Sequence, residues 1–332
     1  MAFLNALPGA AAQGLIWGLM AIGVYISYKI LDIADLTVDG SICTGACVCA
    51  VLYALGIPNI TTAWLNLWMP SWLGWLSTGI GMLIPVICAF LAGMLTGVTT
   101  GLLHTVLGIP SILAGILTQL MLYTVNLLIL GGKALCAIDP RANSLMVHMS
   151  NNTGSIITLV IIAAIVIFLL YKFFYTEIGL TLKSTGDNPD MSRAQGINVD
   201  RNKVIGLAIA NGIVALAGAL LAQYKGSANI NDGRGAIVVA LAAIFIGLSV
   251  SLKIKPNFVV SLIGVISGAI VYYIVYNVVI LMGLSTDYLK MLSALIVALF
   301  LGIPYLKSRY FTKRKDLRPS DLAPKAGGDG NA

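Results

Sequence analysis

Long apolar segments, separated by short polar linkers, run through almost the whole chain. Each holds about 20 mainly apolar residues, the length that a helix needs to cross the hydrocarbon core of a bilayer. The segments lack the alternation of apolar and polar residues that is typical of barrel strands. The pattern therefore predicts an all-α, polytopic membrane protein with about nine or ten transmembrane helices. We expect these helices at roughly 11–30, 38–56, 74–97, 108–131, 154–174, 203–223, 235–251, 257–282 and 288–306.

The charges in the linkers predict the orientation. Basic residues gather in 172–203, at Lys253 and Lys255, and in 307–332. Cytoplasmic loops are enriched in Lys and Arg, so these regions are expected on the cytoplasmic side. We expect residues 1–306 to form the transmembrane domain and 307–332 a basic cytoplasmic tail that is disordered at its end.

The beginning of the chain decides whether the number of membrane crossings is odd or even. The first apolar segment has no basic residues before it, so we expect a retained helix and not a cleaved signal. Nine helices place the N-terminus outside. A tenth is expected if residues 31–56 form a broken helix, because Asp32, Asp35 and Asp39 all fall where that segment opens.

The composition excludes an ordinary soluble domain. Hydrophobic residues make up 58% of the 332 residues and charged residues 10%, whereas soluble domains carry about 25% charged residues. The net charge of +7 would also be compatible with nucleic-acid binding. The basic residues lie between apolar segments and form no groove with interleaved aromatic residues, so we expect the lipid bilayer and no nucleic acid as a partner.

Residues for catalysis are scarce. The chain has two histidines, His104 and His148, and one glutamate, Glu177, and it has no glycine-rich phosphate-binding loop. Cys43 and Cys47 share a helical face, but no nearby histidine completes a metal site. We therefore expect no enzyme activity, catalytic residue, metal or cofactor in this chain; if ATP drives it, the ATP and Mg²⁺ are bound by another chain.

The linker 176–204 is the most informative polar segment. Its apolar residues follow a helical spacing on both sides of a Gly186-Asp187-Asn188-Pro189 sequence, and Asn or Asp before Pro marks a turn and a helix start. The linker therefore predicts a short helix, a turn and a second short helix that ends at Gly196. We expect Gly186 and Gly196 to set turns. An ordinary solvated loop is the alternative.

Several stretches resemble one family. They are Glu177–Leu180, Lys183–Asn188 and Ala194–Asn198 in the linker, with Ala215–Gly226 and Ile244–Leu248 further on. Together they are similar to the cytoplasmic coupling loop and neighbouring helices of ABC permeases of the branched-chain amino acid and ribose importer type. The stretch 31–41 resembles a mostly uncharacterised subgroup, of which some members are proposed to move tryptophan or tyrosine. The resemblance covers most of residues 15–305.

The resemblance implies a permease in the bacterial inner membrane, with its C-terminus cytoplasmic. It implies a second permease copy, in a homodimer or pseudo-dimer, two ATPase subunits and an extracytoplasmic solute-binding protein. The expected cargo is a small solute, and the hypothesis is an amino acid, with aromatic amino acids included. The alternatives are a permease for a sugar or nucleoside and an ion-coupled secondary transporter, which buried mid-span carboxylates would favour; we find no convincing one. Lys183 stands where many relatives carry Arg. A lysine keeps the charge but would lose the bidentate contact that an arginine can make.

The expected site residues fall into two groups. The coupling loop comprises Gly179, Lys183, Gly186, Asp187, Asn188, Pro189, Arg193, Gly196 and Asn198. Candidates for the translocation path are Asp39, Gly40, Asn126, Asp232, Tyr273 and Asn277. Carboxylates near lipid are costly and often functional; the alternatives are helix capping for the two aspartates and hydrogen bonds between helices for the rest. We expect Arg234 to neutralise Asp232.

Two further patterns concern packing and the membrane surface. Gly93, Gly97 and Gly101 are spaced by four residues, which favours a close helix crossing, as do Gly264 and Gly268. Four of the five tryptophans lie in or beside 57–73, which we expect to face outside. That segment suits an aromatic belt at the membrane surface or, alternatively, a docking surface for a binding protein.

Overall fold

The computed structural model describes residues 2–68, 74–139, 145–149, 152–251 and 257–281, and four isolated positions further on. Helices dominate these ranges. Their order is α1 (Ala2–Tyr25), the π-helix η1 (Ile26–Ile30), α2 (Val38–Ala54), α3 (Ile57–Trp68), α4 (Gly74–Thr105), α5 (Ser111–Ile129), β1 (Leu135–Ala137), α6 (Asn152–Phe174), α7 (Glu177–Asp187), α8 (Pro189–Ala194), α9 (Val199–Lys225), β2 (Ser227–Asn229), α10 (Ala236–Ser251) and α11 (Phe258–Leu281).

The predicted fold class, an all-α polytopic membrane protein, is confirmed. In the described ranges six helices are long and apolar enough to cross a bilayer. A seventh crossing is formed if α2 and α3, bent by 57° at Leu55 and Gly56, count as one, and α10 is a shorter apolar helix. The tail 307–332 and, apart from the four isolated positions, the predicted helix at 288–306 lie outside the described residues.

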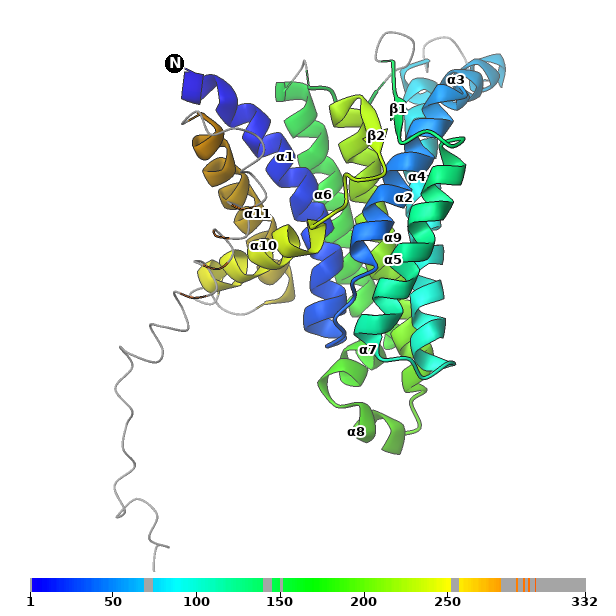
Figure 1. Cartoon of the computed structure of the whole chain (residues 1–332), viewed down its shortest axis with the longest axis vertical. Helices are drawn as coiled ribbons and strands as arrows, with labels where there is room; N and C mark the ends of the chain where they lie inside the picture. The colour runs from blue at the N-terminus through cyan, green and yellow to red at the C-terminus, as the bar shows by residue number, and fades with distance from the viewer. Residues whose placement is uncertain are drawn as a thin grey trace, which may run out of the picture.

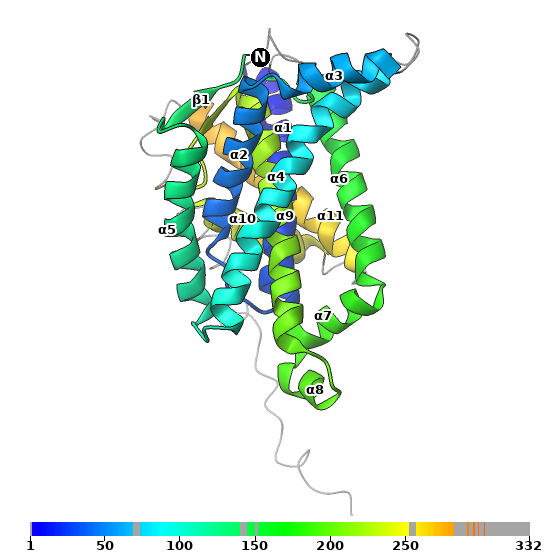
Figure 2. The same cartoon turned by 90° about the vertical axis from the view of Figure 1, so that its right-hand side faces the viewer.

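The centre of the bundle is α9, which packs against α1, α2 and α4 (Figure 2). The predicted glycine crossing is confirmed: Gly93, Gly97 and Gly101 of α4 face the α9 backbone so closely that a Cβ atom at Gly97 would collide with the Leu207 carbonyl oxygen. Gly264 and Gly268 likewise pack close to α10, against Gly247. Small residues allow this approach, because no side chain separates the two backbones.

The outer helices expose apolar side chains. Leu95 of α4, Leu128 of α5 and Leu169 of α6 are each more than half exposed. Faces of this kind are stable in lipid and not in water, which agrees with the composition.

The two ends of the bundle differ. Helices α7 and α8 lie at one end, and the N-terminus, α3 and β1 lie at the other (Figure 1). This agrees with an odd number of crossings between the N-terminus and the basic linker 176–204. Two elements were not predicted: α3 within the expected linker 57–73, and the antiparallel pair of β1 with β2, in which Leu135 faces Asn229.

Candidate functional site

The linker 176–204, called the coupling segment below, folds as two short helices, as predicted. Three polar side chains cap the helix starts: Thr176 Oγ1 accepts from the Gly179 amide in α7, Asn188 Oδ1 from Met191 in α8 and Asn198 Oδ1 from Arg201 in α9. Such caps satisfy amides that have no partner within their own helix. Pro189 occupies the first turn of α8, where it costs no hydrogen bond.

One face of α7 docks on the bundle. Gly179, Leu182 and Thr185 are buried, and Asn202 Nδ2 of α9 donates to Thr185 Oγ1 at 3.0 Å. The expectation that Gly186 sets a turn was wrong, because Gly186 is helical and a Cβ there would collide with the Ile30 carbonyl oxygen. Gly186 is therefore a close-packing residue. Gly196 does set a turn, with a φ of +81°.

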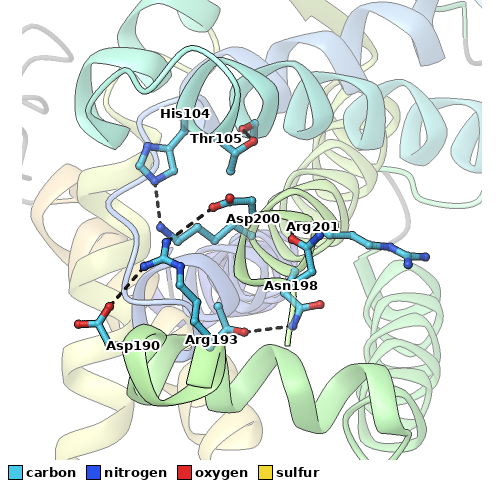
Figure 3. Close-up of polar contacts among 11 residues, drawn as sticks. His104, Thr105, Asp190, Arg193, Asn198, Asp200 and Arg201 are labelled. Atoms are coloured by element: carbon cyan, nitrogen blue, oxygen red, sulfur yellow. Dashed lines mark hydrogen bonds and ion pairs between the residues drawn. The ribbon is translucent and has the colours of Figure 1, made fainter. Parts of the chain in front are cut away.

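The other face of the coupling segment is exposed. Lys183, Asp187, Pro189 and Arg193 lie on it, and the Arg193 guanidinium lies 3.3 Å from the Asp190 carboxylate and 4.0 Å from that of Asp200 (Figure 3). These pairs are open to solvent, so they contribute little stability, and they leave the charges available to another surface.

A second contact joins α9 to the far end of α4. Lys203 Nζ lies 3.3 Å from His104 Nε2, and His104 Nδ1 lies 2.8 Å from the Ile109 carbonyl oxygen (Figure 3). A carbonyl only accepts, so Nδ1 carries the proton and Nε2 accepts from Lys203. The turn between α4 and α5 is thereby tied to the coupling segment.

A polar linker, residues 31–37, leads from η1 into α2 through the interior. Asp35, only 3% exposed, receives hydrogen bonds from Asn211 Nδ2 of α9 at 2.6 Å and from the Thr37 amide at 2.9 Å. The network continues from Asn211 through Ser41 to Thr96 of α4, at 2.6 Å and 2.7 Å. The expectation that no carboxylate is buried among the spans was thus wrong for Asp35.

Asp39 links two helix starts. Its carboxylate accepts from the amides of Gly235 and Ile237, both at 2.9 Å, so it caps α10 and not its own helix. Both α2 and α10 begin part-way along the bundle (Figure 1). Discontinuous helices whose N-termini meet inside a membrane domain are typical of transporter substrate sites.

A polar cavity of about 270 Å³ lies beside this junction. Its walls come from α2, α5 and the loop 230–235: Asp39, Gly40, Cys43, Gln119, Leu120, Tyr123, Asn126, Ile230 and Arg234. Of the predicted path residues, the structure therefore brings together Asp39, Gly40 and Asn126. Asn126 is 1% exposed, and its Oδ1 has no hydrogen-bond partner.

The other predicted path residues lie elsewhere. Asp232 pairs with Lys225 at 3.0 Å and does not line the cavity. The expectation that Arg234 neutralises Asp232 was wrong, since the Arg234 guanidinium lies 5.9 Å from the centre of the Tyr123 ring. Tyr273 packs on Trp17 of α1, and Asn277 Nδ2 donates to the Tyr273 carbonyl oxygen within α11.

Sequence reasoning missed three residues of this region: Gln119, Arg234 as a wall residue, and Asn211 as the partner of Asp35. Gln119 and Asn211 are amides in the middle of apolar stretches of their helices, which is a usable signal. Cys43 holds the junction together: its Sγ accepts from the Gly233 amide at 3.0 Å and donates to the Ile230 carbonyl oxygen at 3.2 Å.

Comparison with known proteins places this architecture in a family. The family model described as "Branched-chain amino acid transport system / permease component" matches residues 7–302. The "Tyrosine transport system permease protein" of Clostridioides difficile (strain R20291) is 34% identical over 303 residues, 90% of this chain and 91% of that protein. The "Uncharacterized protein RP368" of Rickettsia prowazekii (strain Madrid E) is 30% identical over 95% of this chain and its own full length.

A more distant relative is the "Autoinducer 2 import system permease protein LsrC" of Yersinia pestis (strain Pestoides F), 29% identical over 67% of this chain and 62% of that protein. No solved structure matches. The match across 7–302 and the apolar helices agree, and the chain belongs to the branched-chain amino acid transport system permease family of ABC-type, multi-pass membrane permeases.

Proposed function

We propose that this chain is the membrane permease of a binding-protein-dependent ABC importer for an amino acid, with an aromatic amino acid as the first cargo to test. The observation that carries the proposal is a continuous path of contacts from the exposed coupling segment to the polar cavity. The permease whose printed name specifies tyrosine transport, 34% identical, supports the choice of cargo.

The path begins at α7. Gly186 of α7 packs on the carbonyl of Ile30, and Leu31 packs against Gly206 of α9. A displacement of α7 is therefore passed to the linker 31–37, which its hydrogen bonds through Asp35 and Thr37 join to α9 and α4. The same linker leads into the first turn of α2, where Asp39 caps α10 and lines the cavity. Packed elements transmit movement in this way because their interiors compress little.

The cycle assigns the remaining tasks to other chains. Two ATPase subunits that press on the coupling segment bind ATP with Mg²⁺ and hydrolyse the ATP. A solute-binding protein delivers the cargo on the opposite side. A second copy of this chain completes the path. In this proposal the chain itself binds the cargo and couples its passage to the ATPase subunits.

Two other cargo or energy assignments follow from particular observations. The relative named for autoinducer 2 import favours a cargo other than an amino acid. The buried Asp35 favours coupling to an ion, because intramembrane carboxylates are often ion or proton sites. The hydrogen bonds from Asn211 and Thr37 already account for Asp35, so the ATP-driven mechanism is preferred.

The test is Gly186→Val in the complex with its ATPase and binding protein. The new side chain collides with the Ile30 carbonyl and lifts α7 away from the linker. We therefore expect binding-protein-stimulated ATPase activity to fall at least about tenfold, which corresponds to a loss of about 1.4 kcal/mol of coupling free energy. Gly79→Val in α4 is the control, because nothing lies within 4 Å of a Cβ at Gly79. Full stimulation in a folded Gly186→Val complex would sink the coupling assignment.

A further inference from the structure

We propose that the cavity beside Asp39 binds the α-ammonium and α-carboxylate groups of an amino acid and makes no selective contact with its side chain. This inference rests on the proposed function, since it concerns the cargo of the same permease. In this proposal, this chain distinguishes amino acids from other solutes. The binding protein distinguishes one amino acid from another.

The carboxylate end of the site is Arg234. Its guanidinium lies on the wall of the cavity and over the face of Tyr123, at 5.9 Å from the ring centre. It makes no ion pair with any residue that the structure describes, and the nearest acidic residue in sequence, Asp232, is paired with Lys225. A guanidinium is attracted to the face of an aromatic ring, and it presents a fork of donors that matches a carboxylate.

The ammonium end is formed by Asp39 and Asn126. The Asp39 carboxylate accepts the amides of Gly235 and Ile237, and a carboxylate has about four acceptor positions in all. Asn126 lines the cavity and its Oδ1 is buried without a hydrogen-bond partner, so a turn of the amide that brings this acceptor to the cavity would satisfy it. An ammonium group carries three donors and has no acceptor, so the acceptor oxygens of these two residues suit it, and the charge of Asp39 repels an anion.

The shape of the cavity argues against recognition of a large side chain. Gly40, Cys43 and Asn126 are buried at its floor, whereas Leu120, Tyr123 and Arg234 are exposed at its rim. The volume of about 270 Å³ lies below the roughly 300–1,000 Å³ of sites that enclose a drug-sized ligand. A small polar group fits between the floor and the rim, and whatever is attached to it projects past Leu120 and Tyr123.

The experiment measures equilibrium binding of radiolabelled L-tyrosine to the full chain in lipid nanodiscs, without its partners. We expect L-leucine and L-alanine to compete about as well as L-tyrosine. Tyramine, which lacks the carboxylate, and 3-(4-hydroxyphenyl)propionate, which lacks the ammonium group, should compete at least about tenfold less, since each loses a charged hydrogen bond. Equal competition by either analogue would overturn the proposal.

Three variants locate the site. Arg234→Gln should weaken binding at least about tenfold, and Lys133→Gln, which removes an exposed charge outside the cavity, should not change it. Asn126→Leu should weaken binding without lowering the thermal midpoint, because it removes an unpaired buried atom. Wild-type affinity in Arg234→Gln or in folded Asn126→Leu contradicts the assignment.

The two proposals fail separately. Absence of tyrosine binding to the isolated wild-type chain overturns the cavity assignment, whatever the ATPase assay gives. The importer proposal fails if the complete complex shows no ATPase stimulation by the loaded binding protein.

Discussion

Asp35 shows how much a single residue decides in this molecule. Its carboxylate lies in the interior, where an unpaired charge is unfavourable, and its two oxygens accept from Asn211 and from the Thr37 amide. Removal of the acceptor leaves the Asn211 donor facing an apolar group. The network that ties the linker 31–37 to α9 then loses its centre.

We expect Asp35→Leu to lower the free energy of unfolding by about 1–3 kcal/mol, the cost of a buried polar group left unpaired. Asp35→Asn should cost less. The Asn211 amide can turn over, so that its oxygen accepts from the new side chain and its nitrogen donates to Ser41 Oγ. Denaturant titration in detergent, followed by tryptophan fluorescence, measures both variants. Equal losses for Leu and Asn would contradict a role based on hydrogen bonding.

At the scale of the helix, glycine positions matter more than hydrophobic content. Helices α4 and α9 meet along Gly93, Gly97 and Gly101, and their backbones approach too closely for any side chain in between. In lipid, apolar side chains gain little from leaving the surrounding hydrocarbon, so close packing supplies much of the association.

Gly97→Val should destabilise the fold by about 1–3 kcal/mol, the usual cost of overpacking a tight interface. The Cβ atom at this position would meet the Leu207 carbonyl and Ala208, both backbone groups that cannot rotate away. Gly79→Val, in the same helix with open space around it, should change stability by less than about 0.5 kcal/mol. Thermal unfolding in detergent compares the two, and similar midpoints would show that the crossing tolerates a wider spacing.

At the scale of the whole molecule, the charge pattern and the fold give one orientation. The coupling segment and the segment that follows α5 lie at opposite ends of the bundle (Figure 1). The basic linker is expected in the cytoplasm, so we expect the end that carries β1 to face outside.

A cysteine-labelling experiment tests this orientation. In a background without the five native cysteines, Lys133→Cys should react with a membrane-impermeant maleimide in intact cells, and Asp190→Cys should react only after the membrane is opened; both positions are exposed. The reverse pattern would place α7 and α8 outside and remove the basis for ATPase coupling.

The apolar segments and linker charges were sufficient for the coarse result. Helix positions, the two short helices of the coupling segment and the glycine crossing followed from local pattern, because helix period, capping and small-residue spacing are read over a few turns. The predictions that went wrong concerned partners: Gly186 was assigned to a turn although it packs on Ile30, and Asp232 was paired with Arg234 although it binds Lys225.

By itself, the sequence determined that this chain lies in a membrane, where its helices run and which linker stands apart as polar. Only the tertiary structure decided that Asp39 caps α10, nearly two hundred residues further along, and that Asn126 and Arg234 face the same cavity. The physical reason is range. Hydrophobic period and charge act within one helix or linker, whereas the meeting of polar side chains depends on how closely whole helices pack, and here glycines on several of them set that distance.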